Sequence, residues 1–182
     1  MFGRLIAYWV YGGFLAGLLL LLLGPVLVRS WSAPLVATFL CLPVYMLHQY
    51  EEHDNDRFRR FVNQQIGKEN ALTLLAVFVI NVPAVWGVVG ISLALAAMIR
   101  PGFGLIAIYL IAVNGAIHVV YAAITRGYNP GLGTAIGLFL PLGAYGIATM
   151  QQADAGSAIM HITGAAVAIA IHVVIALYVM RR

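Results

Sequence analysis

The chain has 182 residues, of which 63% are hydrophobic and only 9% are charged, and its formal net charge is +4. A soluble domain carries about 25% charged residues, so this composition argues against a soluble globular protein and is typical of a polytopic membrane protein. The basic residues stand at the ends of apolar segments, which argues against a nucleic-acid surface, and the single cysteine, Cys41, excludes a disulfide within the chain.

Apolar stretches long enough to cross a bilayer follow one another along the chain, separated by charges, prolines and glycines. The first is too long for a signal peptide, so we expect it to be retained. We therefore predict an all-α fold in which residues 1–182 form one integral membrane domain. Its six transmembrane helices are expected at 5–28, 33–53, 71–99, 102–125, 131–150 and 157–180.

The connection at 54–70 is longer than the others and contains an amphipathic pattern. Apolar residues at 58, 61, 62 and 66 follow helical spacing, arginines flank them, and Gly67 can end a helix. This pattern predicts a short amphipathic interfacial helix between the second and third spans, with a solvated loop as the alternative.

The distribution of basic residues predicts the topology. With the N-terminus inside, one side of the membrane collects eight of the ten basic residues, and the other side has only Arg29 and Arg100. We therefore expect both termini in the cytoplasm and the chain in a lipid bilayer, most simply the cytoplasmic membrane of a prokaryote.

The stretch "YMLHQYEEHDND" at 45–56 places ionisable residues at the inner end of the second span. His48, Glu51 and Glu52 stand at positions i, i+3 and i+4, so they share one helix face. The alternative is a solvated helix end with a surface ion pair to Arg57. The residues that follow, 53–56, are expected to form a solvated turn.

Other spans carry polar residues at a similar depth, counted at about 1.5 Å of rise per residue. Asn114, His118 and Tyr121 form a stripe on the fourth span, while Asn81 and His172 lie in the inner halves of the third and sixth. Interhelical hydrogen bonding is the simpler explanation for each asparagine alone, and a neutral imidazole bonded to a carbonyl for His118. Their agreement in depth favours a common site.

Imidazoles and carboxylates together form a first shell for a divalent metal ion such as Zn, Fe or Mn. The expected ligands are His48, Glu51, Glu52, His118 and His172. Glu51 and Glu52 are also the catalytic candidates, because one of them can act as general base on a metal-bound water. Asn81, Asn114 and Tyr121 are expected to orient these groups, and no other cofactor-binding residues are expected.

The residues His48-Gln49-Tyr50-Glu51-Glu52 spell H-x-x-E-E, and the chain resembles the HXXEE domain family of small bacterial and archaeal integral membrane proteins. The run Asn114-x-x-x-His118 and the turn "GYNPG" at 127–131 look like further motifs of that family. The resemblance covers most of the chain and implies a site, but it implies no particular reaction.

A weaker functional analogy links the chain to the CAAX-prenyl-protease and bacteriocin-processing membrane endopeptidases. Those enzymes use E-E-x-x-x-R, then a His, then a His followed by an Asn one turn later. Glu51-Glu52, His118 and His172 occur in that order, but Arg57 is one residue too far and position 176 is Ala. The analogy implies that Glu51 activates water and that His118 or His172 stabilises an oxyanion.

These observations favour a metal-dependent membrane enzyme, a hydrolase acting on a lipid, lipidated or peptide substrate in the cytoplasmic half of the bilayer. A haem-binding redox protein with His118 and His172 as axial ligands is one alternative. A proton-coupled transporter or channel, with Glu and His as a relay, is another.

Overall fold

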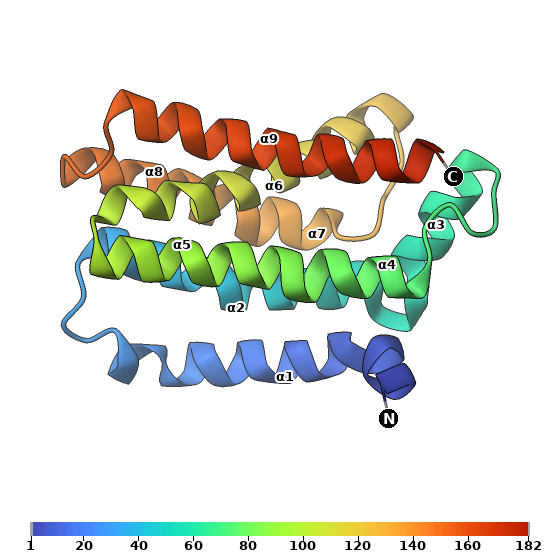
Figure 1. Cartoon of the computed structure of the whole chain (residues 1–182), viewed down its shortest axis with the longest axis horizontal. Coiled ribbons are helices and arrows are strands. Elements are labelled where there is room, and N and C mark those ends of the chain that lie inside the picture. Colours follow the sequence, from blue (N-terminus) through green and yellow to red (C-terminus); the bar gives the residue numbers. More distant parts are fainter. Residues whose placement is uncertain (1, 182) are drawn as a thin grey trace.

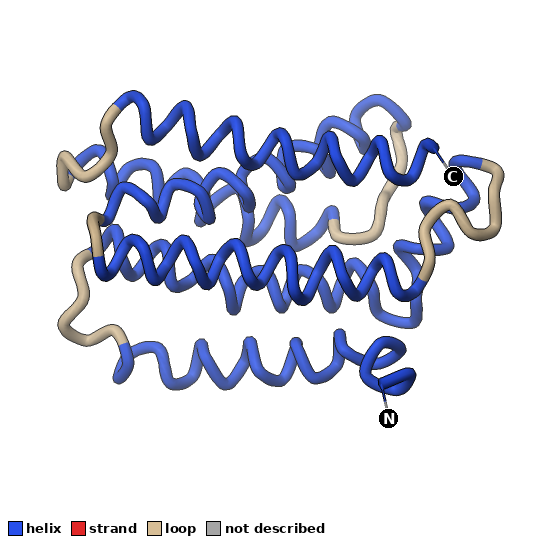
Figure 2. The backbone as a smooth tube through the Cα atoms, viewed as in Figure 1, coloured by secondary structure: helices blue, strands red, loops and turns tan. Residues whose placement is uncertain are grey.

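A computed structural model describes residues 2–181, which form helices joined by short connections and contain no strand (Figures 1 and 2). This confirms the predicted all-α class. The elements in chain order are α1 (Phe2–Leu27), α2 (Ala33–His53), η1 (Asp54–Asp56), α3 (Arg57–Ile66), α4 (Leu74–Val79), η2 (Ile80–Trp86), α5 (Gly87–Met98), η3 (Pro101–Gly104), α6 (Leu105–Thr125), α7 (Leu132–Thr134), η4 (Ala135–Phe139), α8 (Leu140–Gln152) and α9 (Ala158–Arg181).

Within residues 2–181, five continuous helices are long and apolar enough to cross a membrane: Phe2–Leu27, Leu74–Met98, Pro101–Thr125, Leu132–Gln152 and Ala158–Arg181. Two of them contain a π-helical segment, η2 and η4, where the hydrogen-bond ladder widens locally. The helix α2 is not among the five, because polar residues at its C-terminal end lower its hydropathy. The prediction that α2 is a sixth span therefore stays a prediction.

The helix α2 lies at the centre of the bundle and packs against α1, α5, α6 and α8. The helix α9 packs chiefly against α6 and lies at one edge of the bundle, while α1 lies at the opposite edge (Figure 1). Side chains of α6, η4 and α8 form the most deeply buried part of the core, including Ile108, Ile111, Phe139 and Met150. This arrangement brings the C-terminal halves of α2 and α6 together.

Local signals set the helix ends. Ser32 precedes α2, and Pro34 lies in its first turn. Proline is favoured there because the first N–H groups of a helix have no intrahelical partner, so the missing N–H of proline costs nothing. Thr73 caps α4 by accepting a hydrogen bond from the Ala76 N–H at 3.2 Å, so this helix begins later than the predicted residue 71. Gly67, at φ 73°, ends α3 as predicted.

The long connection contains a helix, α3, at the position where the amphipathic pattern predicts one. Asn63 on α3 is buried. Its side-chain oxygen accepts a hydrogen bond from the Leu72 N–H at 2.8 Å, and its side-chain NH2 donates one to the Leu72 carbonyl oxygen at 3.0 Å. These bonds tie α3 to the start of α4. The location of α3 at a membrane interface stays a prediction.

The outward faces of the edge helices are apolar. Leu15, Leu22 and Val26 on α1 are largely exposed, and so are Ile162 and Val174 on α9. Exposed apolar surface of this extent is unfavourable in water, which supports a hydrocarbon environment for these helices. The start of α1, the end of α9 and the whole of α3 lie at the same end of the bundle (Figure 1).

The close contact between α6 and α9 provides a test of this packing. A Cβ at Gly164 would lie 2.8 Å from the Leu105 carbonyl oxygen, whereas a Cβ at Gly90 would meet no atom within 4 Å. We expect Gly164→Ala to lower the free energy of unfolding by about 1–3 kcal/mol, because the helices must move apart. Gly90→Ala should leave stability unchanged or raise it by up to about 1 kcal/mol. Denaturant titration in detergent micelles measures both variants, and equal stability of the two would contradict the packing.

Candidate metal centre

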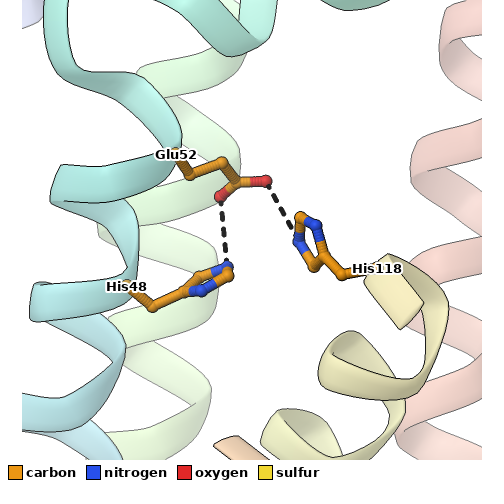
Figure 3. Close-up of side chains that lie close together, drawn as sticks. All are labelled: His48, Glu52 and His118. Atoms are coloured by element: carbon orange, nitrogen blue, oxygen red, sulfur yellow. Dashed lines mark ion pairs between the residues drawn. The ribbon is translucent and has the colours of Figure 1, made fainter. Parts of the chain in front are cut away.

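Three buried side chains converge between α2 and α6. His48 and Glu52 stand one turn apart on α2, and His118 faces them from α6 (Figure 3). The two imidazole Nε2 atoms each lie 3.7 Å from one of the two Glu52 carboxylate oxygens. The residues His48, Glu52 and His118 are 0%, 6% and 6% exposed, so bulk water does not solvate the carboxylate.

A hydrogen bond on the Nδ1 side, away from Glu52, fixes the ring orientation of His48. Its Nδ1 lies 2.8 Å from the Thr134 hydroxyl, which in turn donates its single proton to a Glu51 oxygen at 2.5 Å. Because that hydroxyl has no second proton to give, the His48 Nδ1–H must donate to it. The Nε2 of His48 therefore carries a lone pair, and it points toward Glu52.

Asn129 fixes His118 in the same way. The Asn129 side-chain NH2 donates to the His118 carbonyl oxygen at 3.0 Å, which orients the amide so that its oxygen faces the imidazole. The His118 Nδ1–H then donates to this oxygen, at 2.5 Å. The Nε2 of His118 is left with its lone pair toward Glu52.

Two nitrogen lone pairs and a carboxylate therefore face a common point from which bulk water is excluded. The ligand atoms of His48, Glu52 and His118 all lie within 4.8 Å of one another, and within residues 2–181 the buried Nε2 of His48 has no hydrogen-bond partner. Three acceptors at this range repel one another; His53, whose Nε2 lies 3.1 Å from Glu52, offsets the carboxylate in part, and a cation held between the three groups would offset it further. The outer hydrogen bonds to Thr134 and Asn129 are those that metal-ligating histidines make. The group could hold a metal ion.

Glu51, the third member of the predicted triad, faces a different element. Its carboxylate accepts hydrogen bonds from the backbone N–H groups of Gly133 and Thr134 at 3.0 and 2.6 Å, and from the Tyr128 hydroxyl at 2.8 Å. The first N–H groups of a helix have no intrahelical partners, so Glu51 caps the helix that begins at Leu132. Burial, followed by the bond to Glu51, raises the pKa of Tyr128, which keeps the phenol protonated as a donor.

Gly131 lies between this cap and the metal-ligand cluster. It has φ 98°, a conformation that side-chain-bearing residues rarely adopt, and a Cβ there would lie 2.8 Å from the Cε1 atoms of both His48 and His118. The N-cap position of this helix therefore has no side chain to offer, and the capping carboxylate comes from α2 instead.

The remaining predicted residues stand outside the cluster. His172 on α9 contacts Asn114 on α6, with 3.4 Å between Nε2 and Nδ2, and both line a cavity of about 420 Å³ that Tyr121 also lines. Asn81 on η2 lines the same cavity and accepts a hydrogen bond from Gln49 at 2.9 Å. The predicted roles of Glu51 and His172 as ligands therefore have no support in this geometry, while Glu52, His48 and His118 come together as expected.

His53 was expected in a solvated turn, and this is wrong: its exposure is 7%, and its Nε2 lies 3.1 Å from Glu52. Trp9 of α1 and Phe58 of α3 cover its ring, with centroids 5.4 and 5.2 Å away. Sequence reasoning also missed Asn129 and Thr134. The only signal for them was the Asn-Pro-Gly turn, which returns the chain across the end of α6.

The family comparison matches residues 39–146 to a family model described as a protein of unknown function with HXXEE motif. The match spans more than half of the chain and includes His48, Glu51, Glu52 and His118. The chain belongs to the HXXEE family. No curated protein and no solved structure matches it.

The structure gives a physical reason for the spacing of the HXXEE motif. The His and the second Glu stand at i and i+4, which places His48 and Glu52 on the face toward α6. The first Glu, at i+3, is rotated by about 100° from the second, which turns Glu51 toward the helix start at Leu132. One motif thus supplies two candidate ligands and one cap.

Metal content tests the centre directly. We expect the purified protein to bind a divalent metal ion in equimolar amount, and Glu52→Gln or His118→Ala to weaken binding by more than about 100-fold, because each removes a ligand. His161→Ala is the control, since His161 pairs with Tyr109 and lies roughly 16 Å along α9 from His172. Elemental analysis after dialysis against a metal buffer measures all four proteins. An unchanged metal content in the Glu52→Gln protein would show that the metal does not bind at this cluster.

Gly131→Ala tests the close contact of the turn with both imidazoles. We expect metal affinity to fall by about 10–100-fold, because the added Cβ must displace the rings or the turn. Gly67→Ala is the matched control: Gly67 has φ 73°, but a Cβ there meets no atom within 4 Å. Both variants carry the same kind of backbone strain, so equal loss of affinity in the two would contradict the contact. The same metal titration measures both.

Proposed function

We propose that the protein is a metal-dependent integral membrane enzyme, a hydrolase that acts on a lipid or lipidated substrate in the cytoplasmic half of the bilayer. The observation that carries this proposal is the position of the His48, Glu52 and His118 cluster at the wall of the large cavity, which both Glu52 and His118 line. A purely structural metal site would be closed on all sides.

The ligand set supports catalysis rather than structure. Two histidines and one carboxylate are the protein ligands of several hydrolytic zinc enzymes and of non-haem iron sites, and both kinds keep open positions for water or substrate. A metal ion held there would polarise a carbonyl or phosphoryl oxygen and lower the pKa of a bound water toward about 7. The identity of the metal, Zn, Fe or Mn, is left to experiment.

The residues around the centre divide the remaining work in this proposal. Glu52 is a ligand and a catalytic residue. Glu51 is a positioning residue, because it holds the turn that carries Asn129 and the helix start that carries Thr134. Asn114, Tyr121 and His172 line the cavity and are placed to contact a substrate. The contact between Asn81 and Gln49 holds η2 against α2, next to the cluster.

The membrane setting of the proposal rests on the five apolar helices and on the distribution of basic residues. With both termini in the cytoplasm, the cluster lies near the cytoplasmic ends of α2 and α6, within reach of the inner leaflet. Within residues 2–181 the two histidines do not face a common haem site, because the His118 Nε2 lies 3.7 Å from Glu52 and that of His172 lies 3.4 Å from Asn114.

Hydrolysis is tested with metal-loaded protein in phosphatidylcholine vesicles, using a panel of ester-, amide- and phosphodiester-linked lipids and a prenylated peptide. Mass spectrometry detects the products. We expect metal-dependent cleavage of at least one linkage class and a loss of at least about 100-fold in Glu52→Gln, with His161→Ala retaining activity. Cleavage that persists unchanged in metal-free Glu52→Gln protein would overturn the proposal.

A further inference from the structure

The cavity beside the centre has walls from four elements that are distant in sequence. The elements are α3, the α4–η2 segment, α6 and α9, and α2 adds Tyr45, Glu52 and His53 to the lining. Its volume, about 420 Å³, is within the range of small-molecule sites. The helix α9 packs chiefly against α6, and near its C-terminal end Val179 shares a buried apolar cluster with Leu72 and Val77, so α9 also closes part of the side toward α4.

The walls are predominantly apolar, which restricts the occupant. Val77 and Val85 come from α4–η2, Leu110 from α6, and Ile171 and Val179 from α9. A sugar, a nucleotide or a peptide backbone would leave polar groups without partners against such walls, at a cost of several kcal/mol for each group. A hydrocarbon chain incurs no such cost.

The polar groups of the cavity lie beside the metal-ligand cluster or are already paired. Asn81 is held by Gln49, and Asn129 by His118, whereas Asn114, one turn before His118, has a buried Oδ1 without a hydrogen-bond partner among residues 2–181. Leu110 stands eight residues before His118 on α6, so the apolar part extends roughly 12 Å from the cluster toward the middle of the bundle. A molecule lying along the cavity would have its apolar part deep and one polar linkage at the cluster.

The rim of the cavity is continuous with the apolar outer surface. Ile117 and Met180 line the cavity and are also 45% and 59% exposed, and the outer face of α9 next to them carries Val174 and Leu177. Since these helices are apolar enough to cross a membrane, the medium that meets this rim is the acyl region of a bilayer. Entry is therefore lateral, from the membrane.

We infer that the cavity binds one long hydrocarbon chain of a membrane amphiphile, which enters from the bilayer past the exposed rim residues of α6 and α9 and presents its headgroup linkage to the His48, Glu52 and His118 cluster. This inference rests on the proposed function for the fate of that linkage, but the binding of the chain does not require hydrolysis. The chain is either the straight acyl chain of a membrane lipid or the branched chain of a prenylated molecule, and the two share the same chemistry of recognition.

Photocrosslinking tests the binding of the chain. The full-length protein in phosphatidylcholine vesicles is irradiated with hexadecanol that carries a terminal diazirine, and peptide mass spectrometry locates the adducts. We expect adducts on the cavity faces of α6, α9 and α4–η2. Ala176 on α9 lines the cavity, so Ala176→Trp should lower the yield there by at least about tenfold, and Ala176→Leu by less. Ala170→Trp, on the exposed part of the same helix, is the matched control and should leave the yield unchanged.

Competition identifies the source of the chain. Displacement of the probe by unlabelled hexadecanol favours a lipid acyl chain, and stronger displacement by farnesol favours a prenyl chain; either supports the inference. Absence of displacement by both, or equal yields in Ala176→Trp and Ala170→Trp, overturns it. Crosslinking in metal-free Glu52→Gln protein separates the two proposals, because chain binding should survive there while hydrolysis does not.

Discussion

The candidate centre depends on one buried carboxylate. Glu52 lies between two imidazole nitrogens whose lone pairs both point at it, in a region that bulk water does not reach. Such a group needs a compensating partner: His53, whose Nε2 lies 3.1 Å from the carboxylate, is one, and a metal ion held by the cluster would be a second. The hydrogen bonds from Thr134 and Asn129 keep both rings in the required tautomer, and these two residues come from a part of the chain about eighty positions away from Glu52.

Glu51 links that distant part to the centre. Glu51 caps the helix that begins at Leu132 and so holds the turn at 127–131 against α2. This turn places Asn129 beside His118. Two adjacent glutamates that look equivalent in the sequence therefore act on different elements. The separation follows from helix geometry, because consecutive side chains diverge by about 100°.

Sequence patterns predict the helices to within a few residues, since apolar runs and helix-ending residues such as Gly67 act locally, although the cap at Thr73 was not predicted. They also predict the pairing of His48 with Glu52, which one helical turn determines. Counting residues gives the depth of His118 and His172 in the bundle. It does not give the rotation of α6 and α9 about their own axes, which depends on side-chain packing. The sequence therefore could not show that His118 joins the cluster and that His172 does not. The burial of His53 depends on Trp9 and Phe58 from other helices, and the position of Asn129 depends on positive φ at Arg126 and Gly131. No local pattern contains such information.

The position of α9 at the edge of the bundle has an evolutionary consequence. The segment shared with the family, residues 39–146, contains all three candidate ligands, both residues that orient them and the capping glutamate. The helix α9 lies outside that segment and supplies one wall of the cavity without supplying a ligand. Substitutions in α9 can therefore reshape the cavity while the three candidate ligands on α2 and α6 stay unchanged, so the shape of the cavity can change without rebuilding the cluster.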